Sequence, residues 1–480
     1  MAKKKSGQEE ENEILCLKKS LIISKQECAQ WEEGFSQLEQ GCAQLEKENQ
    51  VLKEKLGANS GNSPKPSSQD PFRGSRSSRP TGSKPGGQFG HPGHIRALYS
   101  ENKVTKNVDL FPEECSSCHS KIFEESVTSL QLHQVADISE ISPNVTQYRI
   151  YTLKCAHCGK KVRAQLPKKA KHSFGPRLQA FLAAQSAEGL ISRRRLSSLA
   201  SYFKIRVSLG STCNILKRAA DLLKNPAKKI QEHVLQQGRI HADEISWRVT
   251  KEKSYLWMGA TPDCTFFNVN PSRSVEAYKR IFGSFRGTLV TDRYSLCNQH
   301  PGRRQSYLAH IDRSLAKMEQ REGVDAFCSK TSQKELGKIF ALWHEYKAEK
   351  FSREELQKRA KDPIENIRTI LMFAAEKAKL RQSKSLARNL LKCFSHLWTF
   401  LYEKGVKLTN NLAERALRPC VILRKISLGS QSTWEARLIE RLMTVAVTLQ
   451  QRLKNVFLFL TALFESFYEI RPPPFPSSVI

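Results

Sequence analysis

The sequence has 480 residues, a length typical of about three domains. It contains 78 lysine and arginine residues against 47 aspartate and glutamate residues, and the net charge of +31 favours polyanionic partners, with nucleic acid first and an anionic membrane surface second. The first residues lack the apolar segment of a secretory signal, and the most apolar late stretch, 456–467, is too short to span a bilayer, so we expect a soluble protein inside the cell and exclude membrane-spanning classes.

Residues 1–56 carry a heptad pattern that predicts an N-terminal coiled coil. The seam positions are Leu17, Ser24, Trp31, Leu38, Leu45 and Leu52 at d, and Leu21, Cys28, Phe35, Cys42, Asn49 and Leu56 at a. A seam of this length needs a partner helix, so we expect a homodimer or a higher oligomer. Asn49 at an a position favours a dimer in fixed register. The alternative is a single helix that packs on its own chain.

Residues 57–100 are rich in glycine, serine, proline and arginine and hold almost no large apolar side chains. Such a segment cannot bury enough surface to offset its conformational entropy, so it is predicted to be a flexible basic linker. Its basic residues could follow the phosphates of a nucleic acid, and a solvated tether explains them equally well.

Residues 101–167 contain two C-x-x-C motifs that predict a small zinc ribbon. The cysteines concerned are Cys115, Cys118, Cys155 and Cys158. Four thiolates close a tetrahedral site and leave no open position for water, so this zinc is expected to stabilise the fold and not to catalyse. The alternative is a set of free thiols at chance spacing. Other ligand types nearby are expected to be bystanders: His119, His133, Asp137 and His157.

Residues 168–235 have apolar residues at helical spacing, with a break before a second helix that is expected to open at Ser208 or Ser211. This pattern resembles a helix-turn-helix, which would bind DNA. Three consecutive arginines, Arg193, Arg194 and Arg195, suit phosphate groups. A plain helical bundle with a solvated basic face fits the same residues.

The periodicity changes after Gly238, and residues 236–430 are predicted to form a sheet with helices. The expected elements are strands at 239–249, 254–262 and 264–273, a helix at 274–285 and a strand at 287–292. The first strand holds Asp243, and the fourth ends on Asp292. If these strands are neighbours, the two carboxylates project into one cleft. They would repel each other unless a cation lay between them, and oxygen ligands suit magnesium.

A third carboxylate is expected from "LTNNLAERALRPCVILRK", which contains Glu414. Arg415 and Arg418 follow it closely, and a phosphate site benefits from such cations. Less specific explanations exist for both late acids. Asn411 and Glu414 have the spacing of a helix capping box, and Asp292 alone could be a turn residue.

The motifs resemble, in order and over nearly the whole chain, those of the insertion sequence 66 family of transposases. The matching pieces are the N-terminal coil, "NSGNSPKPSS", "KPGGQFGHPGH", the two C-x-x-C knuckles, "GPRL", "HADEISWRV", "YLWM", "GTLVTDRY", "AHIDR", "TNNLAERALRP", "LRK" and "RLKNVFLFL". Each string alone is weak, and the resemblance rests on their common order.

The resemblance implies an α/β catalytic core of the RNase H-like type, with a mixed sheet and helices, over residues 236–430. Its DDE triad falls on Asp243, Asp292 and Glu414, which would bind Mg²⁺ or Mn²⁺. Outside the sheet, the expected segments are a large helical insertion at about 306–404, as in the family, and a C-terminal helical segment at 431–480.

The implied activity is that of a DNA transposase, which cleaves the element's ends and joins the freed 3′-hydroxyl to target DNA by two-metal phosphoryl transfer. Expected partners are DNA, further copies of the chain and companion proteins of the element, in the cytoplasm at the nucleoid and without a membrane. The residues expected near DNA are Arg193, Arg194, Arg195, Arg415, Arg418 and Lys425, with His310 and Arg313 as further candidates. A solvated surface charge explains each of them as well.

Two positions depart from the family pattern. Arg293 follows the second aspartate where the family usually has glycine, and Tyr307-Leu308 precede Ala309-His310 where the family commonly has Cys-Trp. Neither departure removes an expected ligand. Two other functions fit parts of the sequence: a non-catalytic, zinc-containing DNA-binding protein derived from a transposase, and a nuclease that hydrolyses DNA without joining it.

Overall fold

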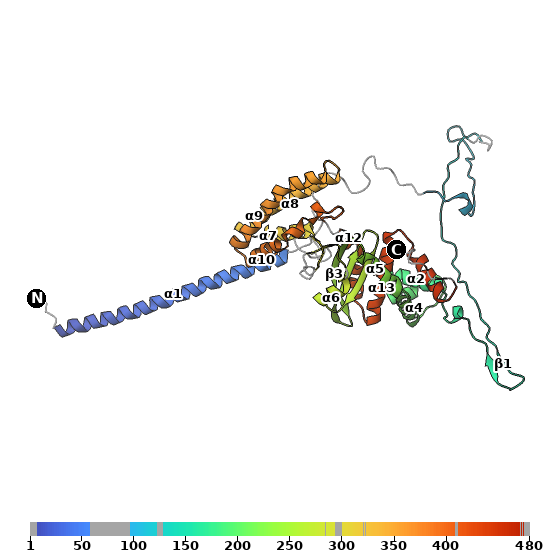
Figure 1. Ribbon diagram of the computed structural model, residues 1–480, viewed down its shortest axis with the longest axis horizontal. Helices are drawn as coiled ribbons and strands as arrows, with labels where there is room; N and C mark the ends of the chain where they lie inside the picture. The colour runs from blue at the N-terminus through green and yellow to red at the C-terminus, as the bar shows by residue number, and fades with distance from the viewer. Residues whose placement is uncertain are drawn as a thin grey trace. The chain divides into compact units, whose positions relative to one another are not determined.

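The computed structural model describes residues 7–57, 97–121, 128–283, 285–292, 300–319, 321, 323–408, 411–470, 472 and 474 (Figure 1). Two compact units make up the chain. The first comprises Met1–Phe72, Leu223–Val456 and Phe475–Ile480, and the second comprises Arg73–Leu222 and Phe457–Pro474. Most of the predicted linker, and Arg293, lie outside the described residues.

Helix α1 (Gly7–Gly57) is a single helix of 51 residues over the predicted heptads. Large side chains of the seam are exposed in the single chain, with exposed fractions of 71% for Trp31, 65% for Phe35 and 67% for Leu38. A stripe of this kind would be covered by a partner helix. The coiled coil and the oligomer therefore stay predictions, because one chain alone does not test them.

A five-stranded mixed sheet forms the centre of the first unit. Its strands are β3 (Arg239–Val249), β4 (Glu252–Ala260), β5 (Thr265–Asn270), β6 (Thr288–Thr291) and β7 (Arg304–Ser306). Their order in the sheet is β5-β4-β3-β6-β7. The first three run antiparallel, whereas β6 pairs parallel with β3 and β7 pairs parallel with β6. The predicted mixed α/β architecture is confirmed, and the first and fourth predicted strands are neighbours.

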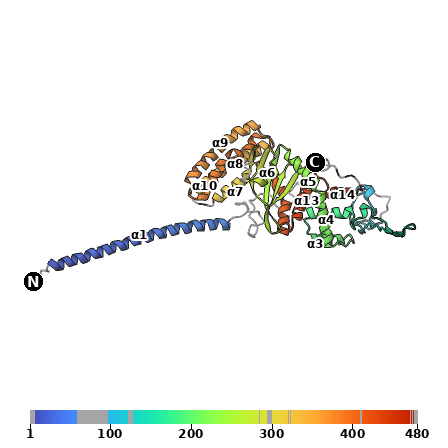
Figure 2. The same ribbon diagram turned by 60° about the horizontal axis from the view of Figure 1, so that its bottom comes forward.

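Helices cover the sheet. They are α5 (Lys224–Leu235), α6 (Val275–Phe282), α12 (Asn411–Ser427) and α13 (Thr433–Gln451). Phe282 of α6 packs on Trp257 and Phe266, while α12 contacts β3 and β4. Figure 2 shows α6 and α13 on opposite sides of the sheet. Strand β3 is therefore central in the sheet and flanked by helices.

Helix α13 covers the outer edge of the sheet at β5. The backbone N–H of Thr265 donates to the hydroxyl of Thr448 at 3.1 Å. The N–H of Phe267 donates to the hydroxyl of Thr444 at 2.9 Å. Edge strands present unpaired backbone groups that can pair with other chains, and these threonines occupy two of them. The first half of the predicted C-terminal segment thus packs on the sheet.

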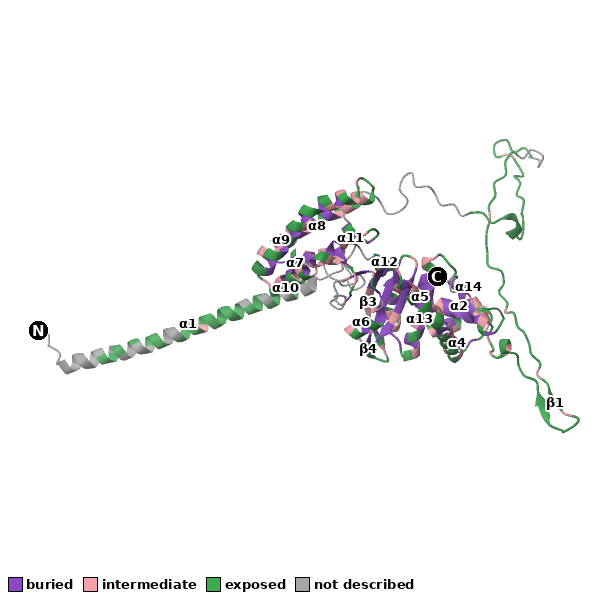
Figure 3. Ribbon diagram, viewed as in Figure 1, coloured by how far each residue is buried: buried purple, intermediate pink, exposed green. Residues whose placement is uncertain are grey.

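A helical insertion separates β7 from α12. It contains α7 (Leu308–Glu319), α8 (Gly323–Lys347), α9 (Arg353–Lys377), α10 (Arg381–Lys392) and α11 (Thr399–Tyr402). Buried residues line α8 and α9, as Figure 3 shows in purple. Their apolar core, with Leu336 and Leu371 among its members, also includes Val290 of β6 and Tyr307. The insertion is consequently packed onto the end of the sheet that carries Asp292.

The second unit combines exposed hairpins with a small helical core. Its main helices are α2 (Pro176–Ala187), α3 (Arg193–Ser201), α4 (Leu209–Leu222) and α14 (Val456–Phe467). Ser208 caps α4, because its hydroxyl accepts the N–H of Ser211 at 3.1 Å. Buried Gln179 of α2 donates to the hydroxyl of Tyr468 at 2.6 Å.

Among the described helices of the chain, none is long and apolar enough to cross a membrane.

Candidate functional site

Asp243 and Asp292 occupy matching positions on two neighbouring parallel strands. In the pairing of β3 with β6, His241 lies opposite Val290. Extending this register by two residues puts Asp243 opposite Asp292, directly after the end of β6. The two carboxylates therefore sit at the same end of the sheet, on the strand adjacency that the sequence interpretation required.

Glu414 lies in the first turn of α12, which packs against β3 and β4. The far end of this helix is fastened to β3. Arg424 donates to the backbone oxygen of Ser246 at 3.0 Å and to its hydroxyl at 2.8 Å. Because Ser246 follows Asp243 by three residues, the helix that carries the third acid is fixed to the strand that carries the first.

The surroundings of Asp243 raise the pKa of its carboxyl well above the usual range. Burial is the main cause, and the negative charges of Asp292, Glu244 and Glu414 add to it. Like charges disfavour a further ionised group nearby. The pKa of Asp243 thus depends on both of the other predicted acids, one of which is more than 100 residues away in the sequence.

Glu414 has a different environment from Asp243. Its carboxylate oxygen Oε1 lies 3.9 Å from His310 Nε2 and 3.9 Å from Arg313 Nη2. These contacts, His310 first, lower the pKa of Glu414 below its ordinary value. His310 and Arg313 were candidates for contact with DNA, and here they hold a carboxylate in its ionised form.

A fourth acid, Glu244, was not singled out in the sequence. It pairs in register with Trp257, which packs on α6, so it lies on the face of the sheet opposite to that of Asp243. Arg273 forms an ion pair with it. Burial, followed by the charge of Asp292, raises the pKa of Glu244 to about 7. Only its position next to Asp243 could have suggested it.

The donor set of the three predicted acids suits a hard divalent cation. Carboxylate oxygens are preferred by Mg²⁺, which completes its shell with water and phosphate oxygens. Mutual repulsion among the acids would be relieved by such a cation. The ligand oxygens of Asp243, Asp292 and Glu414 do not form a group in which all atoms lie within 4.8 Å of one another, in the part of the chain that the structure describes. The three acids supply the type of ligand that Mg²⁺ prefers, and their oxygens do not form a single tight group.

Comparison with known families identifies the chain. The model described as "Transposase IS66 family" matches residues 171–438, more than half of the sequence. The chain belongs to the IS66 family of transposases. The resemblance drawn from the motifs is confirmed, and membership implies DNA as a partner. A comparison with curated proteins finds no match.

This IS66 family member exposes basic side chains along α12. Arg415, Arg418 and Lys425 are all exposed, and Arg415 Nε donates to the backbone oxygen of Asn411 at 3.1 Å. They lie on the same helix as Glu414. Their contact with DNA stays a prediction.

The predicted arginine cluster opens helix α3. Arg193, Arg194 and Arg195 fill its first turn, which has no acidic residue. Arg194 and Arg195 are exposed, and Arg193 is half-buried. The positive end of a helix dipole disfavours cations and attracts anions, so a bound phosphate would stabilise this arrangement.

The two C-x-x-C motifs form hairpins with the same backbone pattern. Cys115 N–H donates to Ser120 O at 2.9 Å, and Cys155 N–H donates to Lys160 O at 2.9 Å. The residue after each motif, His119 or Gly159, has a positive φ of 55° or 71°. Strands β1 (Thr152–Lys154) and β2 (Lys161–Arg163) flank the second hairpin.

The structure does not bring the two hairpins into one four-thiol group, within the residues it describes. Ser120 Oγ lies 3.4 Å from Cys118 Sγ, and this contact lowers the pKa of the Cys118 thiol to about 7. The backbone N–H of Cys158 lowers the pKa of Cys155 in the same direction. Both hairpins thus favour the thiolate form that binds zinc, and the complete site remains a prediction.

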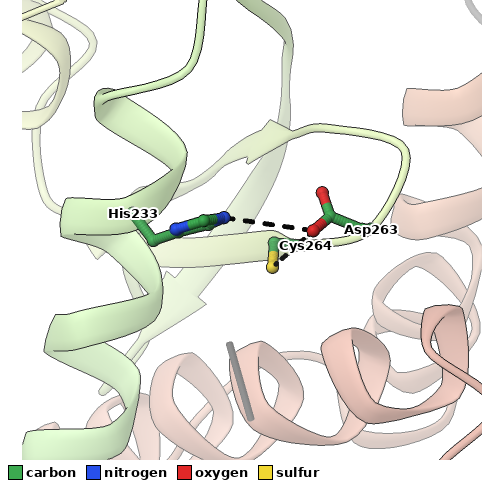
Figure 4. A group of neighbouring side chains, drawn as sticks. All are labelled: His233, Asp263 and Cys264. Atoms are coloured by element: carbon green, nitrogen blue, oxygen red, sulfur yellow. Dashed lines mark hydrogen bonds and ion pairs between the residues drawn. The ribbon is translucent and has the colours of Figure 1, made fainter. Parts of the chain in front are cut away.

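A separate group on the first unit has mixed metal-ligand types. The ligand atoms of His233, Asp263 and Cys264 lie within 4.8 Å of one another (Figure 4). However, Asp263 Oδ2 accepts an N–H from Arg452 at 2.5 Å, and its Oδ1 accepts the hydroxyl of Thr261 at 2.8 Å. Both carboxylate oxygens of Asp263 therefore already accept hydrogen bonds, and the guanidinium of Arg452 supplies a positive charge beside them. The group links the β4–β5 turn to α5 and to the end of α13, and it fits a metal poorly.

Proposed function

We propose that this IS66 family member is a DDE transposase whose Asp243, Asp292 and Glu414 bind a pair of Mg²⁺ or Mn²⁺ ions. It cleaves the ends of its element and joins the freed 3′-hydroxyl to target DNA. The observation that carries the proposal is the placement of Asp243 opposite Asp292 on adjacent parallel strands, with Glu414 on a helix packed over the same sheet.

The core is of the RNase H-like type under this proposal. Three antiparallel strands followed by two parallel strands, with β3 in the centre, support it. The two aspartates lie at the β3–β6 junction of this sheet, and the helical insertion enters after β7. A large insertion between the second and third acids is what the family resemblance implied.

Each residue of the site has a role in this reaction. When bound, the ions would activate the attacking oxygen and stabilise charge on the phosphate and the leaving oxygen. Asp243 must lose its proton to bind an ion, since a carboxylate is the ligand. His310 and Arg313 hold Glu414 ionised and oriented. Arg415 and Arg418 bind the DNA phosphates beside the site.

Other parts of the chain serve DNA binding and assembly. Arg193, Arg194 and Arg195 contact phosphates at the start of α3. The exposure of Arg194 and Arg195 and the absence of acids in that turn support this role. The two cysteine hairpins hold one structural zinc ion. The exposed stripe of α1 joins copies of the chain in a coiled coil.

The experiment is a cleavage and joining assay with a labelled duplex that carries one end of the element, in the presence of Mg²⁺. The test variants are Asp243→Asn, Asp292→Asn and Glu414→Gln. The matched control is Glu252→Gln, which removes an exposed carboxylate from β4 of the same sheet. We expect each test variant to lose both cleavage and joining while it retains DNA binding, and the control to behave as the wild type.

The outcomes separate the competing functions. Cleavage without any joined product would favour a nuclease. DNA binding without either reaction in the wild-type protein would favour a non-catalytic DNA-binding protein derived from a transposase. Full activity of Asp243→Asn would remove the proposed role of the triad.

A further inference from the structure

Tyr307 lies at the junction where β7 ends and α7 begins. Its side chain is buried, with an exposed fraction of 1%. The family commonly has a different residue at this position, so the family pattern does not assign it a role. Tyr307 contacts β3, which carries Asp243, and β6, which ends directly before Asp292.

The hydroxyl of Tyr307 lies between β3 and β6. It is 2.9 Å from the backbone oxygen of Val290 and 3.2 Å from that of Ala242. A tyrosine hydroxyl has one proton, so it donates to these two acceptors in turn or shares the proton between them. Ala242 immediately precedes Asp243, and the hydroxyl bridges the strands next to their last paired residues.

The backbone of Tyr307 adds a third link. Its N–H donates to the oxygen of Thr291 at 3.2 Å, and Thr291 immediately precedes Asp292. Both aspartates are therefore attached to carbonyl groups that this one residue holds in place. Hydrogen bonds in such a buried position are stronger than at the surface, because water does not compete for them.

The ring of Tyr307 also reaches the third acid indirectly. It meets the ring of His310 edge-on, with the centroids 5.8 Å apart. Nε2 of His310 lies 3.9 Å from Glu414 Oε1. Tyr307 thus contacts the supports of all three acids through its side chain and its backbone.

We propose that Tyr307 is a positioning residue that fixes the distance between Asp243 and Asp292 and so sets the affinity of the site for divalent ions. The inference rests on the proposed function of the triad. Residues that orient metal ligands through hydrogen bonds typically change metal affinity by about 10- to 100-fold when they are replaced. A tyrosine that only fills the core would affect stability and leave metal affinity unchanged.

The test is Mn²⁺ binding, followed by electron paramagnetic resonance of the free ion, with the full-length protein and no DNA. Tyr307→Phe removes the hydroxyl and keeps the ring. The matched control is Tyr278→Phe, at another buried tyrosine, on α6. Asp243→Asn reports whether the ion binds at the triad. Unfolding curves recorded by circular dichroism ensure that every variant is titrated well below its own melting temperature.

We expect Tyr307→Phe to weaken Mn²⁺ binding by about 10-fold or more, as for other residues that orient ligands, and Tyr278→Phe to bind as the wild type does. Wild-type affinity in Tyr307→Phe, with binding lost in Asp243→Asn, would overturn this inference and leave the proposed function intact. Unchanged Mn²⁺ binding in Asp243→Asn would instead show that the ion does not bind at the triad, and it would contradict the proposed function.

Discussion

At the residue scale, the surroundings of Asp243 and Glu244 make the negative charge of these two acids unfavourable. Burial and the neighbouring carboxylates raise the pKa of Asp243 well above its usual range, and burial with the charge of Asp292 raises that of Glu244 to about 7. Arg273 offsets only part of this at Glu244. A core that is optimised for stability would avoid such a group of acids. A cation-binding site needs them.

The stability of the metal-free protein should therefore depend on pH in a defined direction. The pKa values of Asp243 and Glu244 are higher in the folded state than in the unfolded state. At a pH between the two values, the folded state binds more protons than the unfolded state. The free energy of unfolding therefore falls as the pH rises through this range. For Glu244 the window runs from 4.5 to about 7. We expect Asp243→Asn, in a chelator at pH 8, to have a larger free energy of unfolding than the wild type, because the substitution removes a buried negative charge that the neighbouring carboxylates disfavour.

Urea unfolding at several pH values measures this effect. The difference between the two proteins should shrink toward pH 4, where both carboxyl groups are protonated. Addition of Mg²⁺ should stabilise the wild type and leave Asp243→Asn unchanged, because a ligand stabilises only the form that binds it. A variant that is less stable than the wild type at pH 8 would show that Asp243 is not under electrostatic strain.

At the element scale, local sequence signals predicted the elements well. Alternation and length indicated the strands that carry Asp243 and Asp292, and Ser208 was among the expected starts of α4. The contacts that fix these elements are long-range and left no local signal. The hydrogen bonds of α13 to β5 and of Arg424 to Ser246 join segments that are more than 170 residues apart. Periodicity alone does not specify such pairs.

The cysteine hairpins give a prediction at this scale. Each has the backbone of a two-thiolate half-site, and each favours the ionised thiol. We expect the purified protein to hold one zinc ion per chain, and Cys155→Ser to lose it, because removing one of four ligands opens the closed site. Mass spectrometry of the metal content checks this. Cys213→Ser, on α4, is the control and should retain zinc. An unchanged zinc content in Cys155→Ser would show that the two hairpins do not form one site.

At the scale of the whole molecule, the sequence indicated a transposase of the IS66 family, and the family match confirms this membership. Motif order predicted the family because it extends over the whole chain, and three acids at wide spacing predicted the candidate site. Glu244 and Tyr307 could not be found in this way. The role of Glu244 depends on the face of the sheet on which it lies. The role of Tyr307 depends on its contacts with the backbone oxygens of Ala242 and Val290.

The most direct test of the central claim is an anomalous difference map from crystals of the full-length protein soaked in Mn²⁺. We predict strong peaks in contact with the carboxylates of Asp243 and Asp292, and Glu414 as a ligand of one of them. Crystals of Asp243→Asn should lose these peaks. A map with no peak at the ends of β3 and β6, or with manganese only at His233, Asp263 and Cys264, would contradict the account.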